Sequence, residues 1–286
     1  MNSKLKFLLE ALIKTFKRQK DFCPFCNRLL DDDKRIIDRK AYFVKLTKCS
    51  GCNLLVRLPT DSVNENEAFY QEEYSQGSTT ELPGDEELVS LLAVSFKDTE
   101  RDYSYYLELL DKMGISKAAR ILDYGCSWGY GTYQLQQAGF DTAGYEISKP
   151  RLQYAVEKLG VRPITDFSVV YDVFDVFFSA HVLEHVPDLK FVFDLADRVL
   201  KPGGYFVAVC PNGSEAFQKK SPLNFHKLWG KVHPILLTDK FVLENFREKL
   251  RIVGSFPLSN MPEEMKENSC HIEIADKWQL VFVYQK

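Results

Sequence analysis

Short apolar runs alternate with amphipathic segments of helix length from residue 120 to the end of the chain. The expected strands are 120–124, 141–146, 174–180, 204–210, 251–256 and 279–284, and the expected helices are 129–138, 149–159 and 239–249. Alternation of strands and helices is typical of a parallel, doubly wound sheet that helices cover on both faces. The sequence therefore predicts an α/β fold for this part of the chain.

The composition excludes several other classes of protein. The chain has 286 residues, of which 45% are hydrophobic, so it can bury a sizeable core and is neither disordered, collagenous nor repetitive. No apolar run reaches the roughly 18 residues that a membrane span needs. Lys4, Lys6 and Lys14 interrupt the apolar N-terminus and no small-residue cleavage site follows, which argues against a signal peptide. We expect a soluble, cytoplasmic protein.

The N-terminal end is basic and the rest of the chain is acidic. Residues 1–60 contain 14 Lys and Arg against 6 Asp and Glu, whereas the remainder contains 23 against 34. This asymmetry indicates either an anionic partner or an attraction between the two parts. Residues 4–18 predict a helix with an apolar face and a face of lysines. That helix either contacts an anionic membrane surface or packs on the protein or a second subunit, and packing is the commoner use.

Four cysteines form two C-x2-C pairs. Cys23 and Cys26 are separated from Cys49 and Cys52 by twenty-two residues. Two such pairs can place four thiolates around one centre, and a tetrahedral sulfur set suits zinc. In a cytosolic chain this spacing favours a metal over disulfides, and two redox dithiols are the alternative. Because a unit of about 40 residues has too small a core to fold alone, we expect the zinc to be structural.

A glycine-bearing turn lies between the first expected strand and its helix. The turn has the pattern G-x-x-x-G-x-G from Gly125, whereas a dinucleotide loop has G-x-G-x-x-G and approaches a pyrophosphate. Asp123, before the turn, would repel a pyrophosphate but can organise contacts to a cationic amino-acid group. Glu146 follows the next strand, where an acid can accept hydrogen bonds from both ribose hydroxyls, and Asp166 offers a third acid. The pattern favours S-adenosylmethionine (SAM) over NAD(P), and a turn that binds nothing is the alternative.

Residues 119–210 resemble the class I SAM-dependent methyltransferases, especially those that methylate small molecules. The matching segments, in the family's order, are 122–129 (LDYGCSWG), 144–148 (GYEIS), 174–179 (FDVFFS), 181–188 (HVLEHVPD) and 200–204 (LKPGG). The resemblance implies a Rossmann-like, doubly wound sheet of seven strands whose last strand is antiparallel. It implies that the glycine loop holds the methionine part of SAM, Glu146 the ribose, and Asp166 and Phe167 the adenine. The implied cofactor contacts are Asp123, Gly125, Cys126, Ser127, Gly129, Glu146, Ile147, Asp166 and Phe167. Ser127 departs from the family, in which many members have glycine there.

A four-cysteine ribbon before this fold resembles methyltransferases that act on nucleotide-linked sugars and surface glycans, and also a group of rRNA guanine methyltransferases. The expected organisation is a basic amphipathic helix over 1–20, a zinc ribbon over 21–59, a linker and helical lead-in over 60–118, and the methyltransferase domain over 119–286. Within the lead-in, residues 87–113 predict helix, and 75–85 predict a linker or mobile loop.

A cluster of histidines follows the fourth expected strand. His181, Glu184 and His185 share one face if they begin a helical turn, and His226 and His233 lie in a later loop that runs over the same edge in this family. His181 is a candidate general base. The cluster also resembles the Glu-x-x-Glu-His metal site of some quinone and RNA methyltransferases, although His181 replaces the first Glu, which disfavours a hard cation. In a third interpretation, Glu184 and His185 only hold the loop together.

These observations predict a SAM-dependent methyltransferase with a structural zinc ribbon. The favoured acceptor is a sugar, nucleotide-sugar or glycan precursor. An RNA methyltransferase is the main alternative, although the chain lacks a basic segment interleaved with aromatic residues. A zinc-ribbon binding protein with a degenerate methyltransferase domain is a further alternative. The atom that would be methylated and the oligomeric state stay open.

Overall fold

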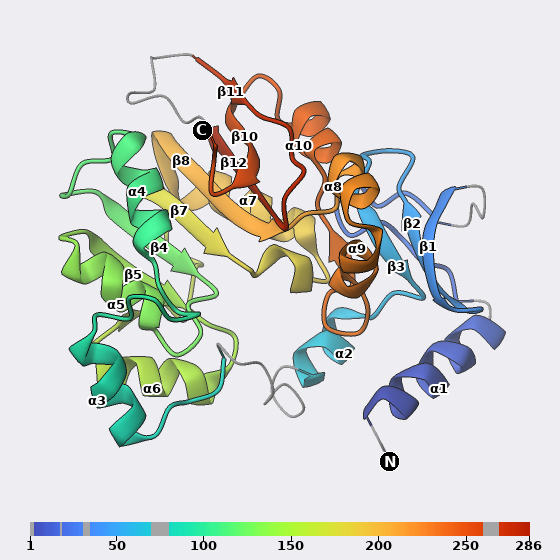
Figure 1. Cartoon of the computed structure of the whole chain (residues 1–286), viewed down its shortest axis with the longest axis horizontal. Coiled ribbons are helices and arrows are strands. Elements are labelled where there is room, and N and C mark those ends of the chain that lie inside the picture. The colour runs from blue at the N-terminus through green and yellow to red at the C-terminus, as the bar shows by residue number, and fades with distance from the viewer. Residues whose placement is uncertain (1–2, 18, 31–34, 70–79, 260–268) are drawn as a thin grey trace.

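The computed structural model describes residues 3–17, 19–30, 35–69, 80–259 and 269–286. Figure 1 shows a large sheet with helices on both faces and a smaller sheet beside it. The helices are α1 (Ser3–Phe16), α2 (Val63–Ala68), α3 (Asp85–Ala93), α4 (Ser104–Lys112), α5 (Tyr130–Gln137), α6 (Lys149–Leu159), α7 (Leu189–Val199), α8 (Glu215–Lys220), α9 (Pro222–Leu228) and α10 (Asp239–Asn245). The strands are β1 (Ile36–Ala41), β2 (Val44–Lys48), β3 (Leu55–Leu58), β4 (Arg120–Tyr124), β5 (Asp141–Tyr145), β6 (Arg162–Pro163), β7 (Phe174–Ala180), β8 (Leu200–Pro211), β9 (Ile235–Leu236), β10 (Leu250–Phe256), β11 (His271–Ile272) and β12 (Gln279–Gln285).

The large sheet has the strand order β11-β10-β12-β8-β7-β4-β5-β6. Strand β12 is antiparallel to both β8 and β10, whereas β4, β5, β6, β7 and β8 pair in parallel. This confirms the predicted doubly wound α/β sheet with its antiparallel last strand. The two-residue strand β11 adds an eighth strand at the edge of the seven that we predicted.

Successive side chains of the central strands point to opposite faces of the large sheet, and each face has its own hydrophobic core. On one face, Ile121 and Phe178 pack with side chains of α4 and α5. On the other face, Leu122 and Phe177 pack with side chains of α7 and α10. Strands buried on both faces are required to be apolar throughout, which is why the sequence shows runs rather than alternation there.

The small sheet has the order β1-β2-β3-β9, so its fourth strand comes from the part of the chain that follows β8. Leu55 of β3 pairs with Leu236 of β9. The cysteine-bearing loops beside this sheet pack on the α7 and α10 face of the large sheet, where the ring centroid of Phe25 lies 4.8 Å from that of Phe241. The expected 21–59 unit is therefore joined to the larger sheet by a continuous core.

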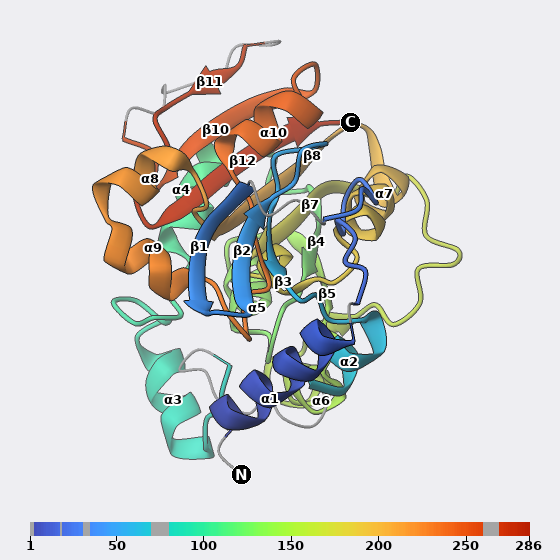
Figure 2. The ribbon, with the colours of Figure 1, turned by 90° about the vertical axis from the view of Figure 1, so that its right-hand side faces the viewer.

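Helix α1 lies beside α2 and the small sheet (Figure 2). Ala11 is buried in the small-sheet core, and Lys14 donates hydrogen bonds to Asp61 (3.0 Å) and Glu65 (2.9 Å). A second group of apolar side chains on α1 is exposed: Leu5, Leu9, Ile13 and Phe16. The helix thus packs on the protein with part of its apolar surface only. Within the described part of the chain, no helix combines the length and apolarity needed to cross a bilayer.

Several elements differ from the sequence-based expectations. The single helical region expected over 87–113 is divided into α3 and α4, because Ser95, Phe96 and Asp98 adopt positive φ angles that a right-handed helix excludes. The expected helix 239–249 ends at Asn245. Helices α7, α8 and α9 were not among the expected elements. Residues 70–79, which include half of the expected linker 75–85, lie outside the described residues.

Candidate active site and cysteine cluster

A pocket lies at the carboxyl ends of β4, β5 and β7, the edge at which open α/β sheets bind ligands. Residues from five parts of the chain line it: Asn66, Thr80, Tyr124, Gly125, Ser127, Tyr145, Glu146, Ile147, Arg151, His181, Val182, His185, Val186 and Pro187. The predicted ribose acid, the glycine loop and the predicted base therefore meet in one cavity. Asp123, Cys126, Gly129, Asp166, Phe167 and Glu184 are not among the lining residues.

The glycine loop is held by the end of the neighbouring strand. The backbone N–H groups of Gly125 and Cys126 both donate to the carbonyl oxygen of Tyr145, at 2.7 and 2.9 Å. Gly125 has φ +85°, and a Cβ there would lie 2.3 Å from Val182, so only glycine fits. Ser127 also has a positive φ, +51°, a backbone conformation that glycine adopts more easily than other residues.

Glu146 connects the loop to the pocket. Its carboxylate accepts hydrogen bonds from the backbone N–H groups of Ser127 (2.9 Å) and Ser148 (2.8 Å). A carboxylate has about four acceptor sites, so two backbone donors leave capacity for two hydroxyl donors from the pocket. Burial raises the pKa of Glu146, while the two N–H groups and the charge of Arg151 oppose that shift.

Asp123 lies behind the loop and not on the pocket wall. Its side chain is 2% exposed and accepts a hydrogen bond of 2.6 Å from the hydroxyl of Thr132. Burial raises the pKa of Asp123 to about 7, and the charge of Glu146 adds to this effect. Asp123 therefore supports the start of α5 through Thr132 in the absence of ligand.

This raised pKa predicts a pH-dependent stability of the cofactor-free protein. The carboxyl keeps its proton in the folded state up to about pH 7, whereas in the unfolded chain it ionises near pH 3.8. Because the folded state binds more protons in this window, the contribution of Asp123 is complete below about pH 4 and is lost as the pH rises through 7. Chemical denaturation of Asp123→Asn should show a smaller loss of unfolding free energy from pH 4 to pH 8 than the wild type. Asp111→Asn, at an exposed site, is the control, and equal pH profiles for wild type and Asp123→Asn would contradict the shift.

The predicted adenine contacts lie at the margin of this site. Asp166 is exposed and accepts hydrogen bonds from the N–H and hydroxyl of Ser168, at 2.7 and 2.8 Å. Phe167 packs on Tyr145, with ring centroids 5.1 Å apart. Their contact with adenine stays a prediction.

The histidines gather around a buried carboxylate. Glu184 and His185 lie in a 3-10 turn, Leu183–His185, directly after β7. Glu184 is fully buried, and its Oε1 lies 3.5 Å from His181 Nδ1 and 3.8 Å from His185 Nε2. The rings of His185 and His233 are in contact, with centroids 4.8 Å apart. His226 instead binds Asp38 of β1, at 2.7 Å, so the structure does not bring it into this cluster.

Sequence reasoning missed several residues of the site. Arg151 of α6 lines the pocket and donates to the carbonyl of Thr80, and Asn66 of α2 donates to the carbonyl of His185. The side-chain amide of Gln279, the first residue of β12, lies 2.6 Å from His181 Nε2. None of these residues belongs to a local motif, because each reaches the site from a distant element. Of these three residues, only Arg151 has a sequence position that could have suggested a place in the pocket, because it lies in the first turn of the helix after Glu146.

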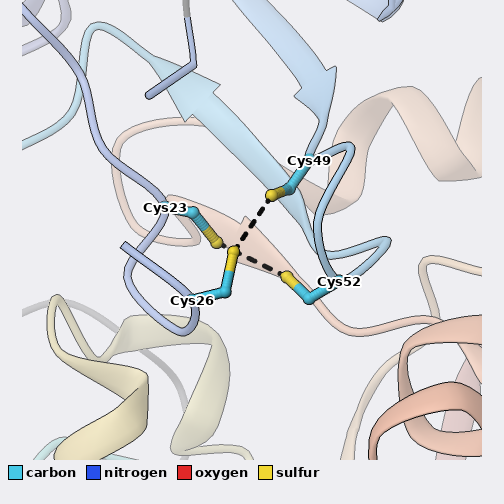
Figure 3. A group of neighbouring side chains, drawn as sticks. All are labelled: Cys23, Cys26, Cys49 and Cys52. Atoms are coloured by element: carbon cyan, nitrogen blue, oxygen red, sulfur yellow. Dashed lines mark hydrogen bonds between the residues drawn. The ribbon is translucent and has the colours of Figure 1, made fainter. Parts of the chain in front are cut away.

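The four paired cysteines converge on one point (Figure 3). All four are free thiols, and their sulfur atoms lie within 4.8 Å of one another. Cys23 Sγ lies 3.5 Å from Cys52 Sγ, and Cys26 Sγ lies 3.4 Å from Cys49 Sγ. Hydrogen bonds from the neighbouring thiols hold the pKa of Cys49 below its usual value. This arrangement brings together all four residues that the spacing predicted.

Comparisons with known proteins agree with the fold. Residues 122–208 match the family model described as "Methyltransferase domain". Phosphoethanolamine N-methyltransferase 1 of Zea mays is 27% identical over 107 residues, which are 34% of this chain and 21% of that protein. Sterol 4-C-methyltransferase strm-1 of Caenorhabditis elegans is 26% identical over 115 residues, which are 36% of this chain and 34% of that protein. The chain thus matches only about a fifth to a third of these relatives' lengths.

Among solved structures, 1,6-didemethyltoxoflavin-N1-methyltransferase of Burkholderia thailandensis, with bound S-adenosylhomocysteine, superposes with a TM-score of 0.48 and 14% identity, covering 87% of this chain and 98% of that one. A SAM-dependent methyltransferase of Mesorhizobium loti gives a TM-score of 0.46 and 18% identity, covering 65% and 100% of the two chains. Residues 122–208, which match the methyltransferase-domain model, include strands β5 to β7 and most of β4 and β8 of the large sheet.

Proposed function

We propose that the chain transfers a methyl group from SAM to a small polar acceptor. The observation that carries this proposal is the meeting of Gly125, Ser127, Glu146 and His181 in one pocket at the carboxyl edge of the sheet. Glu146 can accept hydrogen bonds from ribose hydroxyls, the turn at Gly125 lets a ligand approach the backbone closely, and His181 is a candidate base for a hydroxyl acceptor.

The pocket residues fit this cofactor. Ser127 Oγ is buried without a hydrogen-bond partner in the described part of the chain, as expected of a group that a ligand would satisfy. Glu146 would hold the ribose, and the Gly125 turn would hold the amino-acid part. SAM supplies an already electrophilic methyl group, so the residues of this chain chiefly align the acceptor with the methyl carbon and sulfur.

We propose a sugar, nucleotide-sugar or glycan precursor as the acceptor. The pocket presents polar side chains of Asn66, Thr80 and His181, which suit a hydroxylated molecule. The four-cysteine unit ahead of the domain supports the same class. The names of the matched relatives give two different acceptors, phosphoethanolamine and a sterol. Their similarity therefore supports methyl transfer, and the choice of acceptor rests on the residues of the pocket.

We also propose that Cys23, Cys26, Cys49 and Cys52 hold a structural Zn²⁺. Four sulfur ligands about 2.3 Å from a tetrahedral zinc ion lie about 3.8 Å from one another. The Sγ–Sγ distances of 3.5 Å (Cys23 to Cys52) and 3.4 Å (Cys26 to Cys49) are close to this value. The four cysteines would occupy all four coordination positions of the ion, so no position would be open for a reactant. Its role would be to join β1–β3 and the cysteine-bearing loops to the large sheet.

The proposal is tested on the purified full chain by calorimetry and by transfer of label from methyl-labelled SAM. We expect SAM and S-adenosylhomocysteine to bind, and label to enter a member of a panel of nucleotide-sugars and other small hydroxylated molecules. The same panel contains phosphoethanolamine and total RNA. No binding of either cofactor form would overturn the methyltransferase function, and label in RNA alone would overturn the proposed acceptor.

His181 is the proposed general base, which gives a separate prediction. Its Nδ1 faces Glu184, its Nε2 lies beside the Gln279 amide, and the residue lines the pocket. Removing a general base slows proton transfer by about 10²–10⁴-fold, so His181→Ala should lower kcat by at least about 100-fold for an oxygen acceptor. SAM affinity should change little. His226→Ala is the control, and normal turnover of His181→Ala would exclude it as the base.

A further inference from the structure

A carboxylate and two imidazoles converge next to the pocket. The carboxylate oxygen of Glu184 and ring nitrogens of His185 and His233 lie within 4.8 Å of one another. Glu184 and His185 come from the turn after β7, whereas His233 comes from the loop before β9. His185 also lines the pocket, so the group borders the space in which a cofactor and an acceptor would meet.

Backbone carbonyls orient both imidazoles. His185 Nδ1 lies 2.8 Å from the carbonyl oxygen of Val232, and His233 Nδ1 lies 2.5 Å from that of Leu228. A carbonyl only accepts, so each Nδ1 carries the proton, and in the neutral ring Nε2 carries the lone pair. Metal-binding histidines are held in this way, with one nitrogen donating to a carbonyl and the other facing the ion.

The other ring nitrogen of His185 faces the carboxylate. His185 Nε2 lies 3.8 Å from Glu184 Oε1, and the carbonyl oxygen of Val232 takes up Nδ1. Nε2 is therefore the nitrogen that can bind an ion held between the ring and the carboxylate.

The carboxylate of Glu184 is buried. Its side chain is 1% exposed, and neither carboxylate oxygen has a hydrogen-bond partner in the described part of the chain. Burying a carboxylate without compensation costs several kcal/mol. The His181 Nδ1 at 3.5 Å is too distant for a well-formed hydrogen bond to offset this cost.

We propose that Glu184, His185 and His233 bind a divalent first-row transition metal ion such as Zn²⁺ or Fe²⁺. Two imidazoles and one carboxylate form the donor set of catalytic zinc and non-haem iron sites, which keep a position open for another ligand. Mg²⁺ fits poorly because it prefers oxygen ligands. The open position would take an oxygen of the acceptor, a role that rests on the proposed methyltransferase function, whereas metal binding itself does not.

Cobalt titration of the metal-stripped full chain tests the site. Co²⁺ bound by the four cysteines gives intense thiolate charge-transfer absorption, whereas Co²⁺ bound by nitrogen and oxygen gives only weak visible bands. We expect two ions per wild-type chain, with the weak bands belonging to the second site. Metal analysis after growth in Zn²⁺ should give the same stoichiometry.

His233→Ala and the isosteric Glu184→Gln should weaken the second site by more than about 100-fold, since losing even an outer-shell partner costs 10–100-fold. Both should keep the thiolate bands of the cysteine site. His271→Ala, at a histidine of β11 that binds Glu273, is the matched control and should keep both sites. A wild-type chain without the weak bands, or their persistence in both variants, would overturn the proposal.

Calorimetry with SAM on the same samples separates this inference from the proposed function. If SAM binds but the second metal does not, only the metal site is wrong. If the metal binds and SAM does not, the methyltransferase function fails while the metal site stands.

Discussion

Glu146→Ala is expected to weaken SAM binding by at least about 100-fold. A charged hydrogen bond contributes roughly 1.5–3 kcal/mol, so two ribose hydroxyls on this carboxylate contribute about 3 kcal/mol or more, and each 1.4 kcal/mol is a tenfold change in Kd. The substitution also removes the acceptor for the N–H groups of Ser127 and Ser148, which loosens the loop that faces the cofactor. Calorimetry with SAM and S-adenosylhomocysteine measures the effect.

Two further variants make this result specific. Glu146→Gln keeps the shape of the side chain but loses its charge, so we expect an intermediate loss of affinity. Glu157→Ala removes an exposed glutamate of α6 that binds Gln153, and it should leave SAM affinity unchanged. If Glu146→Ala binds SAM as the wild type does and melts normally, the cofactor assignment is wrong.

The regular part of the fold could be predicted because local signals and tertiary structure agree there. Strand β4 and helix α6 have the predicted bounds, since a buried apolar run marks the strand, and Pro150 and Gly160 mark the two ends of the helix. The division of 87–113 could not be predicted, because it depends on Phe96, which takes a positive φ to bury its ring against Trp128. Tertiary packing overrides helix propensity at that point.

The site residues also divide into those that local sequence indicates and those that depend on tertiary structure. The loop from Gly125 and the acid Glu146 are encoded by glycine spacing and by position after a strand, and both line the pocket. Gln279 reaches His181 from a strand 98 residues away, which no local pattern can indicate. The group formed by His233 with Glu184 and His185 likewise depends on a long loop returning to the sheet edge. The basic N-terminal end forms ion pairs with acidic residues of the same chain, as Lys14 does with Asp61 and Glu65 and Lys48 does with Glu215.

The small sheet includes one strand that no sequence signal indicated. Its cysteines were evident from spacing, but β9 consists of Ile235 and Leu236 only, too short to carry a periodic signal. That strand completes a sheet whose other strands, β1 to β3, lie between residues 36 and 58 of the chain. Consequently the small sheet and the large sheet are expected to lose stability together if the proposed zinc site is disrupted.

Cys49→Ser is expected to lose the zinc and to destabilise more than the small sheet. Binding of structural zinc contributes about 10–16 kcal/mol in isolated zinc-finger peptides, which is comparable to the 5–15 kcal/mol stability of a whole domain. Cys49 and Cys52 belong to the core that also contains Phe241 of α10 and Phe193 of α7. Loss of the ion should therefore lower Tm by about 10 °C or more, given about 2–4 °C per kcal/mol for chains of this size.

Metal analysis and thermal denaturation measure the two effects, and hydrogen exchange locates them. Protection should fall in β2 and β3 and also in β9 and α10, because Leu55 pairs with Leu236 and Phe25 packs on Phe241. Cys270→Ser, at an exposed cysteine outside the cluster, should change neither zinc content nor Tm. A zinc chelator should reproduce the variant's loss of stability in the wild type. Exchange that rises in β2 and β3 while β9 and α10 keep full protection would contradict the shared core, since a separately folding ribbon would behave in that way.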